Sequence, residues 1–137
     1  LCSSISHSLY INYSINSPFA FNRKEIKDHG DKGIFVGCEV KGNALVVDDV
    51  VSSGSSIIDS IKLLKQSNSS CNDVLVAFDR MEIGKIKSAS SELESEYAIN
   101  MHHLIDLDDI YSYIKSNSKY SQHIVSMEEY MNKYRGD

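Results

Sequence analysis

The feature that most limits the fold of this chain is a repeated change between the apolar patterns of strands and of helices. Residues 44–47 form a continuous apolar run, and apolar side chains then recur at helical spacing over 57–64. After a polar segment, residues 74–78 are again apolar throughout. Apolar strands that alternate with helices are typical of parallel sheets covered on both sides. We therefore predict an α/β fold in which a mostly parallel central sheet is flanked by helices on both faces.

The same patterns, followed along the chain, predict the other elements. Helices are predicted over 1–13, 57–64, 88–97, 107–114 and 121–134, and strands over 19–22, 34–40, 44–47, 74–78 and 98–104. Asp106 is the expected N-cap of the helix at 107–114, because a carboxylate there accepts a backbone N–H. Residues 23–33 are almost wholly polar and contain two glycines, so we expect a loop.

Composition excludes several classes of protein. The chain is 42% apolar and 24% charged, which is typical of one globular domain. A net charge of -5 provides no general basic surface, so neither nucleic acid nor an anionic membrane is an expected partner. There is no apolar run of membrane-spanning length and no secretory signal, so we expect a cytoplasmic protein. Reduced thiols, rather than disulfides or a zinc site, are expected at Cys2, Cys38 and Cys71.

The most informative segment is LVVDDVVSSGSS at 45–56. An apolar strand delivers Asp48 and Asp49 to its C-terminal end, where parallel sheets bind ligands. The following Ser- and Gly-rich turn presents backbone N–H groups at the start of a helix, where an anion is favoured. Carboxylates accept hydrogen bonds from ribose hydroxyls, so the segment suits a phosphorylated sugar. It lacks both GxxxxGK[ST] and GxGxxG, and the plainer interpretation is a strand end followed by a helix cap.

This segment is similar to the phosphoribosyl pyrophosphate motif of the type I phosphoribosyltransferases. The resemblance implies that Asp48 and Asp49 contact the ribose hydroxyls and that the next loop binds the 5′-phosphate. Serines at positions 52, 53 and 55 stand where Thr, Ala and Thr are common in that family, which keeps a hydroxyl at two of the three positions. The further contacts to phosphoribosyl pyrophosphate implied in this way are Val50, Val51, Ser52, Ser53, Gly54, Ser55 and Ser56.

A second motif narrows the substrate. The sequence FNRKEIKDHGDKG at 21–33 closely resembles the catalytic loop of bacterial-type orotate phosphoribosyltransferases, although by composition alone it is an ordinary solvated loop. Cations suit such a loop, because cleavage at C1′ leaves negative charge on the departing pyrophosphate. In that family the loop reaches into the partner's site, so a homodimer is implied. The pyrophosphate-binding residues implied are Arg23, Lys24, Lys27 and His29, of which Lys27 and His29 are the catalytic candidates.

The resemblance extends to the Asp-Arg pair after the strand at 74–78. It implies that Arg80 binds the orotate carboxylate, for which a guanidinium fork is suited, and that Ser52 also contacts the base. Magnesium is the expected cofactor, held by pyrophosphate and ribose oxygens rather than directly by protein ligands. His102 and His103 adjoin in a predicted strand, so they point to opposite faces, and neither is assigned a metal. Helix packing, rather than stacking on a base, is expected of Tyr111, Tyr113, Tyr130 and Tyr134.

The resemblance covers essentially all 137 residues, whereas family members carry an additional N-terminal portion that contributes to the site. We therefore expect residues 1–137 to be an N-terminally incomplete phosphoribosyltransferase domain with no room for a fused decarboxylase after Asp137. The implied function is that of a magnesium-dependent glycosyltransferase, an orotate phosphoribosyltransferase of de novo pyrimidine (UMP) biosynthesis. A purine or uracil phosphoribosyltransferase would lack the loop at 21–33. A non-catalytic regulator that binds phosphoribosyl pyrophosphate is the remaining alternative.

Overall fold

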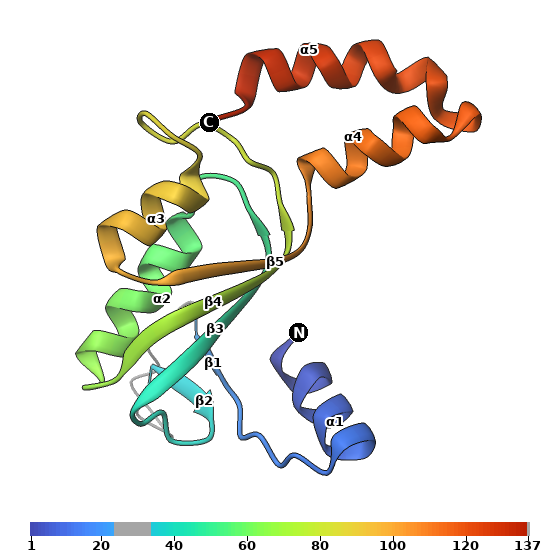
Figure 1. Cartoon of the computed structure of the whole chain (residues 1–137). Helices are drawn as coiled ribbons and strands as arrows, with labels where there is room; N and C mark the ends of the chain where they lie inside the picture. The colour runs from blue at the N-terminus through green and yellow to red at the C-terminus, as the bar shows by residue number, and fades with distance from the viewer. Residues whose placement is uncertain (24–33, 137) are drawn as a thin grey trace.

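The centre of the molecule is a three-stranded parallel sheet with two helices on one face (Figure 1). The computed structural model describes residues 1–23 and 34–136. The strands stand in the order β3 (Asn43–Val51), β4 (Ser70–Asp79) and β5 (Asn100–Asp106). The connecting helices α2 (Ser55–Gln66) and α3 (Ala89–Tyr97) lie side by side against the same face. The predicted α/β fold with a parallel sheet is thereby confirmed.

The hydrophobic core lies between this face of the sheet and the two helices. Val74 and Val76 are both fully buried, and as alternate residues of β4 they point to the same side. Burying a side chain of this size completely stabilises the fold by about 1.5–3 kcal/mol. The core cluster draws on β3, β4, α2, α3 and the residue just before β5. It comprises Val51, Ile57, Ile61, Val74, Val76, Leu93 and Ile99.

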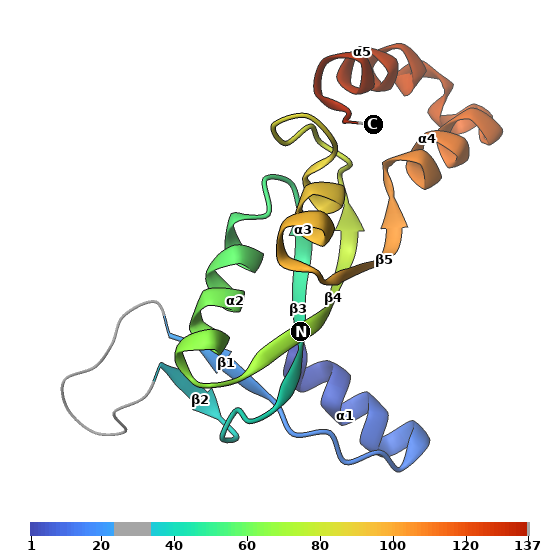
Figure 2. The same cartoon turned by 60° about the vertical axis from the view of Figure 1, so that its left-hand side comes forward.

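The other face of the sheet is much less covered. Helix α1 (Cys2–Tyr13) lies on that side, near β3, but none of its residues is buried (Figures 1 and 2). Leu45 of β3 is 53% exposed and Leu104 of β5 is 71% exposed. Helices therefore lie on both sides of the sheet, but only the side of α2 and α3 is a packed core. β3 is accordingly half-buried, not the fully buried strand that its apolar sequence predicts.

Two short strands flank the predicted loop. β1 (Ala20–Asn22) pairs antiparallel with β2 (Phe35–Gly37), and residues 24–33 between them lie outside the described residues. The strand predicted over 34–40 stops early, at Gly37. There φ is 116°, and a Cβ atom would stand 2.4 Å from the carbonyl oxygen of Phe19, so the backbone geometry requires glycine. The pairing brings Arg23 to Ile34, whose carbonyl accepts the Arg23 N–H at 3.0 Å.

The boundaries of two other elements differ from the prediction. β3 continues past the carboxylates to Val51, because Val50 and Val51 pair with β4, so Asp48 and Asp49 lie within the strand rather than after it. The predicted helix at 121–134 begins late. A 3-10 turn (Ser118–His123) precedes α5 (Ile124–Tyr134), and the Asn117 side chain caps that turn by accepting the Lys119 N–H.

The last helices lie beyond the carboxyl ends of the strands (Figures 1 and 2). α4 (Leu107–Ser116) begins, as predicted, with Asp106 as N-cap, and Asp109 completes a reciprocal capping box. Arg135, just after α5, forms an ion pair with Asp108 of α4. This ion pair ties the end of α5 to the first turn of α4. Within the described residues, no helix has the length and apolar character needed to cross a membrane.

Candidate functional site

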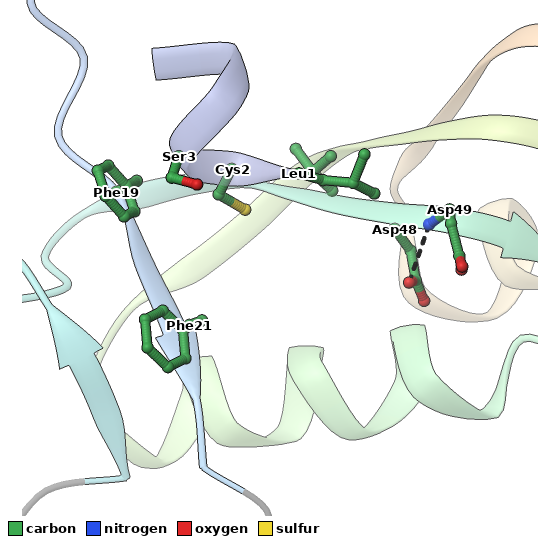
Figure 3. Close-up of a pocket in the computed structure, with 8 residues that line it drawn as sticks. Leu1, Cys2, Ser3, Phe19, Phe21, Asp48 and Asp49 are labelled. Carbon is green, nitrogen blue, oxygen red and sulfur yellow. Dashed lines mark hydrogen bonds between the residues drawn. The ribbon is translucent and has the colours of Figure 1, made fainter. Parts of the chain in front are cut away.

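A hollow of about 390 Å³ opens beside β3 (Figure 3). Three segments that are distant in the sequence form its wall, namely the start of α1, strand β1 and the acidic part of β3. Its size is in the range of small-molecule sites. The residues that line it are Leu1, Cys2, Ser3, Phe19, Phe21, Val47, Asp48 and Asp49. The predicted ribose-binding carboxylates therefore lie on the wall of a pocket.

The two carboxylates of this pocket are each held by the next backbone amide. The Asp49 N–H donates to Asp48 Oδ1 at 3.0 Å, and the Val50 N–H donates to Asp49 Oδ1 at 2.8 Å (Figure 3). Among the described residues, no lysine or arginine forms an ion pair with either carboxylate. Two adjacent anions with oxygens left over for a ligand are suited to accept ribose hydroxyls or to face a hydrated cation.

The turn after β3 has the geometry of an anion site at a helix start. Gly54 is the N-cap of α2 with φ 74°, and its buried position would place a Cβ atom 2.6 Å from Leu93 Cδ1. No side chain caps the first turn of α2, so its amides are available to an external acceptor. Ser53 and Ser55 are exposed, and their hydroxyls lie 3.3 Å apart. Ser56 follows, also exposed, in the first turn of the helix.

Strand pairing brings the predicted base-binding residues together. The Arg80 N–H donates to the carbonyl oxygen of Val51 at 3.1 Å, so Arg80 adjoins Ser52, the first residue of the turn. Val51 itself is 1% exposed and belongs to the core, so its side chain is not accessible to a ligand. Val50 is 39% exposed. The part of Val51 in this site is thus to join the turn to the end of β4.

The side chain of Arg80 has partners that the sequence did not predict. It forms an ion pair with Glu82 at 2.7 Å and hydrogen bonds with the hydroxyl of Tyr130 on α5. The hydrogen bond with Tyr130 contributes most to raising the pKa of Arg80, so the guanidinium stays charged. Tyr130 therefore does more than pack a helix, although no local pattern connects it to a residue 50 positions earlier.

The structure says less about the predicted pyrophosphate-binding residues and the two adjacent histidines. Arg23 lies at the end of the β1–β2 pair, and Lys24, Lys27 and His29 lie outside the described residues. His102 and His103 are both exposed. His102 Nε2 lies 3.0 Å from Asp73 Oδ1, and this hydrogen bond lowers the pKa of Asp73. Among the described residues, no group of three or more acidic, histidine or cysteine side chains could hold a metal ion.

Comparison with known proteins identifies relatives of this chain. No family model matches the chain. The orotate phosphoribosyltransferases of Haemophilus influenzae and Proteus mirabilis are 39% and 37% identical to it over 128 residues. Each alignment covers 93% of this chain and 60% of the relative, so the chain spans about three-fifths of the length of these curated relatives. The resemblance to orotate phosphoribosyltransferases inferred from the sequence is confirmed.

A solved structure supports the same relationship. The crystal structure of orotate phosphoribosyltransferase from Francisella tularensis matches with a TM-score of 0.78 and 28% sequence identity. The match covers 98% of this chain and 64% of that one. The predicted phosphoribosyltransferase fold is thereby confirmed for the described part of the chain.

Proposed function

We propose that this chain forms the phosphoribosyl pyrophosphate and orotate sites of an orotate phosphoribosyltransferase of de novo UMP biosynthesis. The enzyme transfers the 5-phosphoribosyl group to orotate and releases pyrophosphate and orotidine 5′-phosphate. One observation carries the proposal: the acidic pair of β3 leads directly into the turn before α2, and Arg80 is hydrogen-bonded to Val51 at the end of the same strand. This arrangement occurs in a chain that is 39% identical to a curated orotate phosphoribosyltransferase.

Each part of the substrates has a chemically matched place in this site. The carboxylates of Asp48 and Asp49 accept the ribose hydroxyls, and the uncapped first turn of α2 binds the 5′-phosphate through its amides. Arg80 pairs with the carboxylate of orotate, and Ser52 beside it offers a hydroxyl to the base. The sugar thus lies between two fixed groups, which orients C1′ toward the base.

Phosphoribosyl transfer requires stabilisation of the departing pyrophosphate more than activation of orotate. The bond from C1′ to the pyrophosphate oxygen breaks and its electron pair leaves with the pyrophosphate. Orotate N1 forms the new bond to C1′ and loses its proton to the departing pyrophosphate or to solvent. Positive side chains aimed at the departing oxygens lower the barrier most. We assign this task to Arg23, Lys24, Lys27 and His29, with Lys27 and His29 closest to the reaction. The last three lie outside the described residues.

Magnesium fits the acidic pair as a hydrated, substrate-held ion. The pocket offers two carboxylates but no larger cluster of ligands among the described residues, which is too few for an all-protein cage. Asp48 and Asp49 would therefore hold the ion through waters and ribose hydroxyls. When bound, magnesium would neutralise charge on the pyrophosphate.

The proposal includes the assembly and location of the enzyme. The loop at 24–33 would reach into the pocket of a second copy, so the active form would be a homodimer in the cytoplasm. Its partners would be orotate and phosphoribosyl pyrophosphate rather than nucleic acid or a membrane, in line with the net charge of -5. Mixing the Lys27→Ala and Asp48→Asn proteins would test the shared site, because a mixed dimer has one intact pocket and should recover activity. Sedimentation of the mixture would show whether the active species is a dimer.

A base-selection assay tests the function itself. Loss of orotate absorbance is followed with phosphoribosyl pyrophosphate and magnesium, for this chain and for the same reading frame extended upstream. Adenine, hypoxanthine and uracil are offered in parallel. We expect orotate alone to be consumed, and Lys27→Ala to slow the reaction by at least about a hundredfold. Lys62→Ala, an exposed change on α2, is the matched control.

Other outcomes separate the alternatives. Turnover of a purine or of uracil in place of orotate would assign the chain to another phosphoribosyltransferase. Binding of phosphoribosyl pyrophosphate without turnover of any base, in both proteins, would contradict the enzyme assignment and favour the regulator.

A further inference from the structure

The guanidinium of Arg80 is held by a side chain from the end of the chain. Arg80 Nε and Nη2 donate to Tyr130 Oη at 3.1 and 2.7 Å. The Tyr130 hydroxyl donates in turn to Glu82 Oε1 at 2.5 Å, and the same carboxylate lies 2.7 Å from Arg80 Nη2. The three side chains therefore form a closed set of contacts that ties the end of β4 to α5.

Counting donors and acceptors shows what this set leaves for a ligand. A tyrosine hydroxyl has one hydrogen to donate and two lone pairs, and here all three are used. The contacts occupy the Nε and Nη2 side of Arg80. Nη1, with two N–H groups, has no partner among the described residues. One end of the guanidinium is thus fixed by protein, and the other is available to an anion.

The backbone at this place is fixed as well. The carboxylate of Asp79, which is 6% exposed, accepts the Met81 N–H at 2.7 Å, and Met81 adopts a left-handed φ of 50°. The Ile83 N–H donates to the carbonyl oxygen of Tyr134 at the end of α5 at 2.6 Å. The segment that carries Arg80 and the helix that carries Tyr130 are therefore hydrogen-bonded to each other. Backbone hydrogen bonds, and not only the Tyr130 side chain, therefore keep Tyr130 next to Arg80.

Holding an arginine in this way favours binding of a carboxylate. A free arginine loses rotamer entropy when it orders around a ligand, whereas a fixed one has already lost it. The phenol stays protonated at neutral pH, because burial and then the hydrogen bond to Glu82 raise the pKa of Tyr130. The hydroxyl therefore keeps the hydrogen that it donates to Glu82.

We propose that Tyr130, together with Glu82, is a positioning residue that fixes Arg80 to bind the carboxylate of the base through Nη1. The proposal rests on the proposed function, and it adds α5 to the specificity-determining part of the site. Tyr130 acts through Arg80 and does not itself touch the base. Its loss should accordingly affect recognition of the base and leave the sugar-phosphate site intact.

Kinetics of a single-atom change test the proposal. Tyr130→Phe removes the hydroxyl and keeps the ring beside Tyr134, whose centroid is 5.1 Å away. Tyr134→Phe is the matched control on the same helix. In the protein that consumes orotate in the base-selection assay, we expect Tyr130→Phe to raise the KM for orotate about tenfold. The KM for phosphoribosyl pyrophosphate should stay within about twofold, because that ligand does not use Arg80.

The outcomes distinguish this proposal from the one on which it rests. An unchanged KM for orotate in Tyr130→Phe, or an equal rise in both KM values, would overturn the positioning role while the function stands. The same rise in Tyr134→Phe would also overturn it, because the effect would then belong to the helix and not to the hydroxyl. Failure of the unsubstituted protein to use orotate would overturn the proposed function and this role together.

Discussion

At the scale of single residues, the site depends on backbone positions as much as on charged side chains. Asp48 and Asp49 were predictable as candidates from the sequence, because an acidic pair after an apolar run is a local pattern. Glu82 and Tyr130 were not predictable as partners of Arg80, because their meeting depends on where α5 packs. Such long-range contacts have no signature within a window of sequence.

Gly54 provides a residue-scale prediction. Its φ of 74° disfavours any side chain, and a Cβ atom would also stand 2.6 Å from Leu93 in the core. We expect Gly54→Ala to lower the free energy of unfolding by about 2–4 kcal/mol, from backbone strain and overpacking together. Urea denaturation followed by circular dichroism measures this change.

Gly42 is the matched control for that substitution. It has a similar φ of 70°, but nothing lies within 4 Å of the Cβ position. Gly42→Ala should therefore cost only the backbone term, about 1 kcal/mol. Equal losses in the two variants would show that the close approach of Gly54 to Leu93 does not constrain the turn.

At the scale of elements, the sequence predicted the kinds of element better than their ends. The alternation of strand and helix, and the Asp106 cap, follow from short-range patterns that the structure confirms. β3 is longer than predicted, because pairing with β4 extends it through two carboxylates that disfavour strands in isolation. The start of α5 was missed because local hydrogen bonds at 117–121 compete with the helix.

The turn before α3 gives a prediction at this scale. Glu92 of α3 accepts the backbone N–H groups of Lys85, Ile86 and Lys87, and these bonds hold its pKa below the ordinary value of about 4.5. A carboxyl with a lowered folded-state pKa contributes stability that is fully present above its unfolded pKa and is lost as pH falls through the folded value. The turn should therefore lose this contribution on acidification below about pH 4.5.

Substitution of Glu92 checks the sign of this effect. Glu92→Gln keeps the shape of the side chain and removes the charge, so the difference in unfolding free energy from the unsubstituted protein should shrink between pH 6 and about pH 3. The exposed change Glu129→Gln serves as control. A difference that is the same at both pH values would contradict the assignment of the pH dependence to this turn.

At the scale of the whole molecule, one face of the sheet is a core and the other is not. The apolar run at the start of β3 predicts burial on both faces, but Leu45 is exposed, as is Leu104 of β5. Apolar composition reports what a strand can bury, and only the packing of other segments determines what it does bury. The chain spans about three-fifths of the length of its curated relatives.

Because the two faces are buried to different extents, replacing a large side chain by alanine should cost more stability on one face than on the other. Ile57→Ala, at a position 1% exposed in the core, should lower the free energy of unfolding of this chain by about 2–5 kcal/mol. Leu104→Ala, at a position 71% exposed, should change it by no more than about 0.5 kcal/mol. Denaturation at several protein concentrations measures both values. A large cost for Leu104→Ala would mean that a second copy covers this face in solution.

The preference for orotate over uracil tests the central claim most directly, because the two bases differ in the carboxylate that Arg80 is proposed to bind. The measurement is the ratio of kcat/KM for orotate to that for uracil, in the unsubstituted protein, in Arg80→Leu and in the exposed control Lys85→Leu. We predict a ratio of at least about a thousand that falls at least about a hundredfold in Arg80→Leu only. A strong preference for orotate that survives Arg80→Leu would contradict the placement of the base at Arg80.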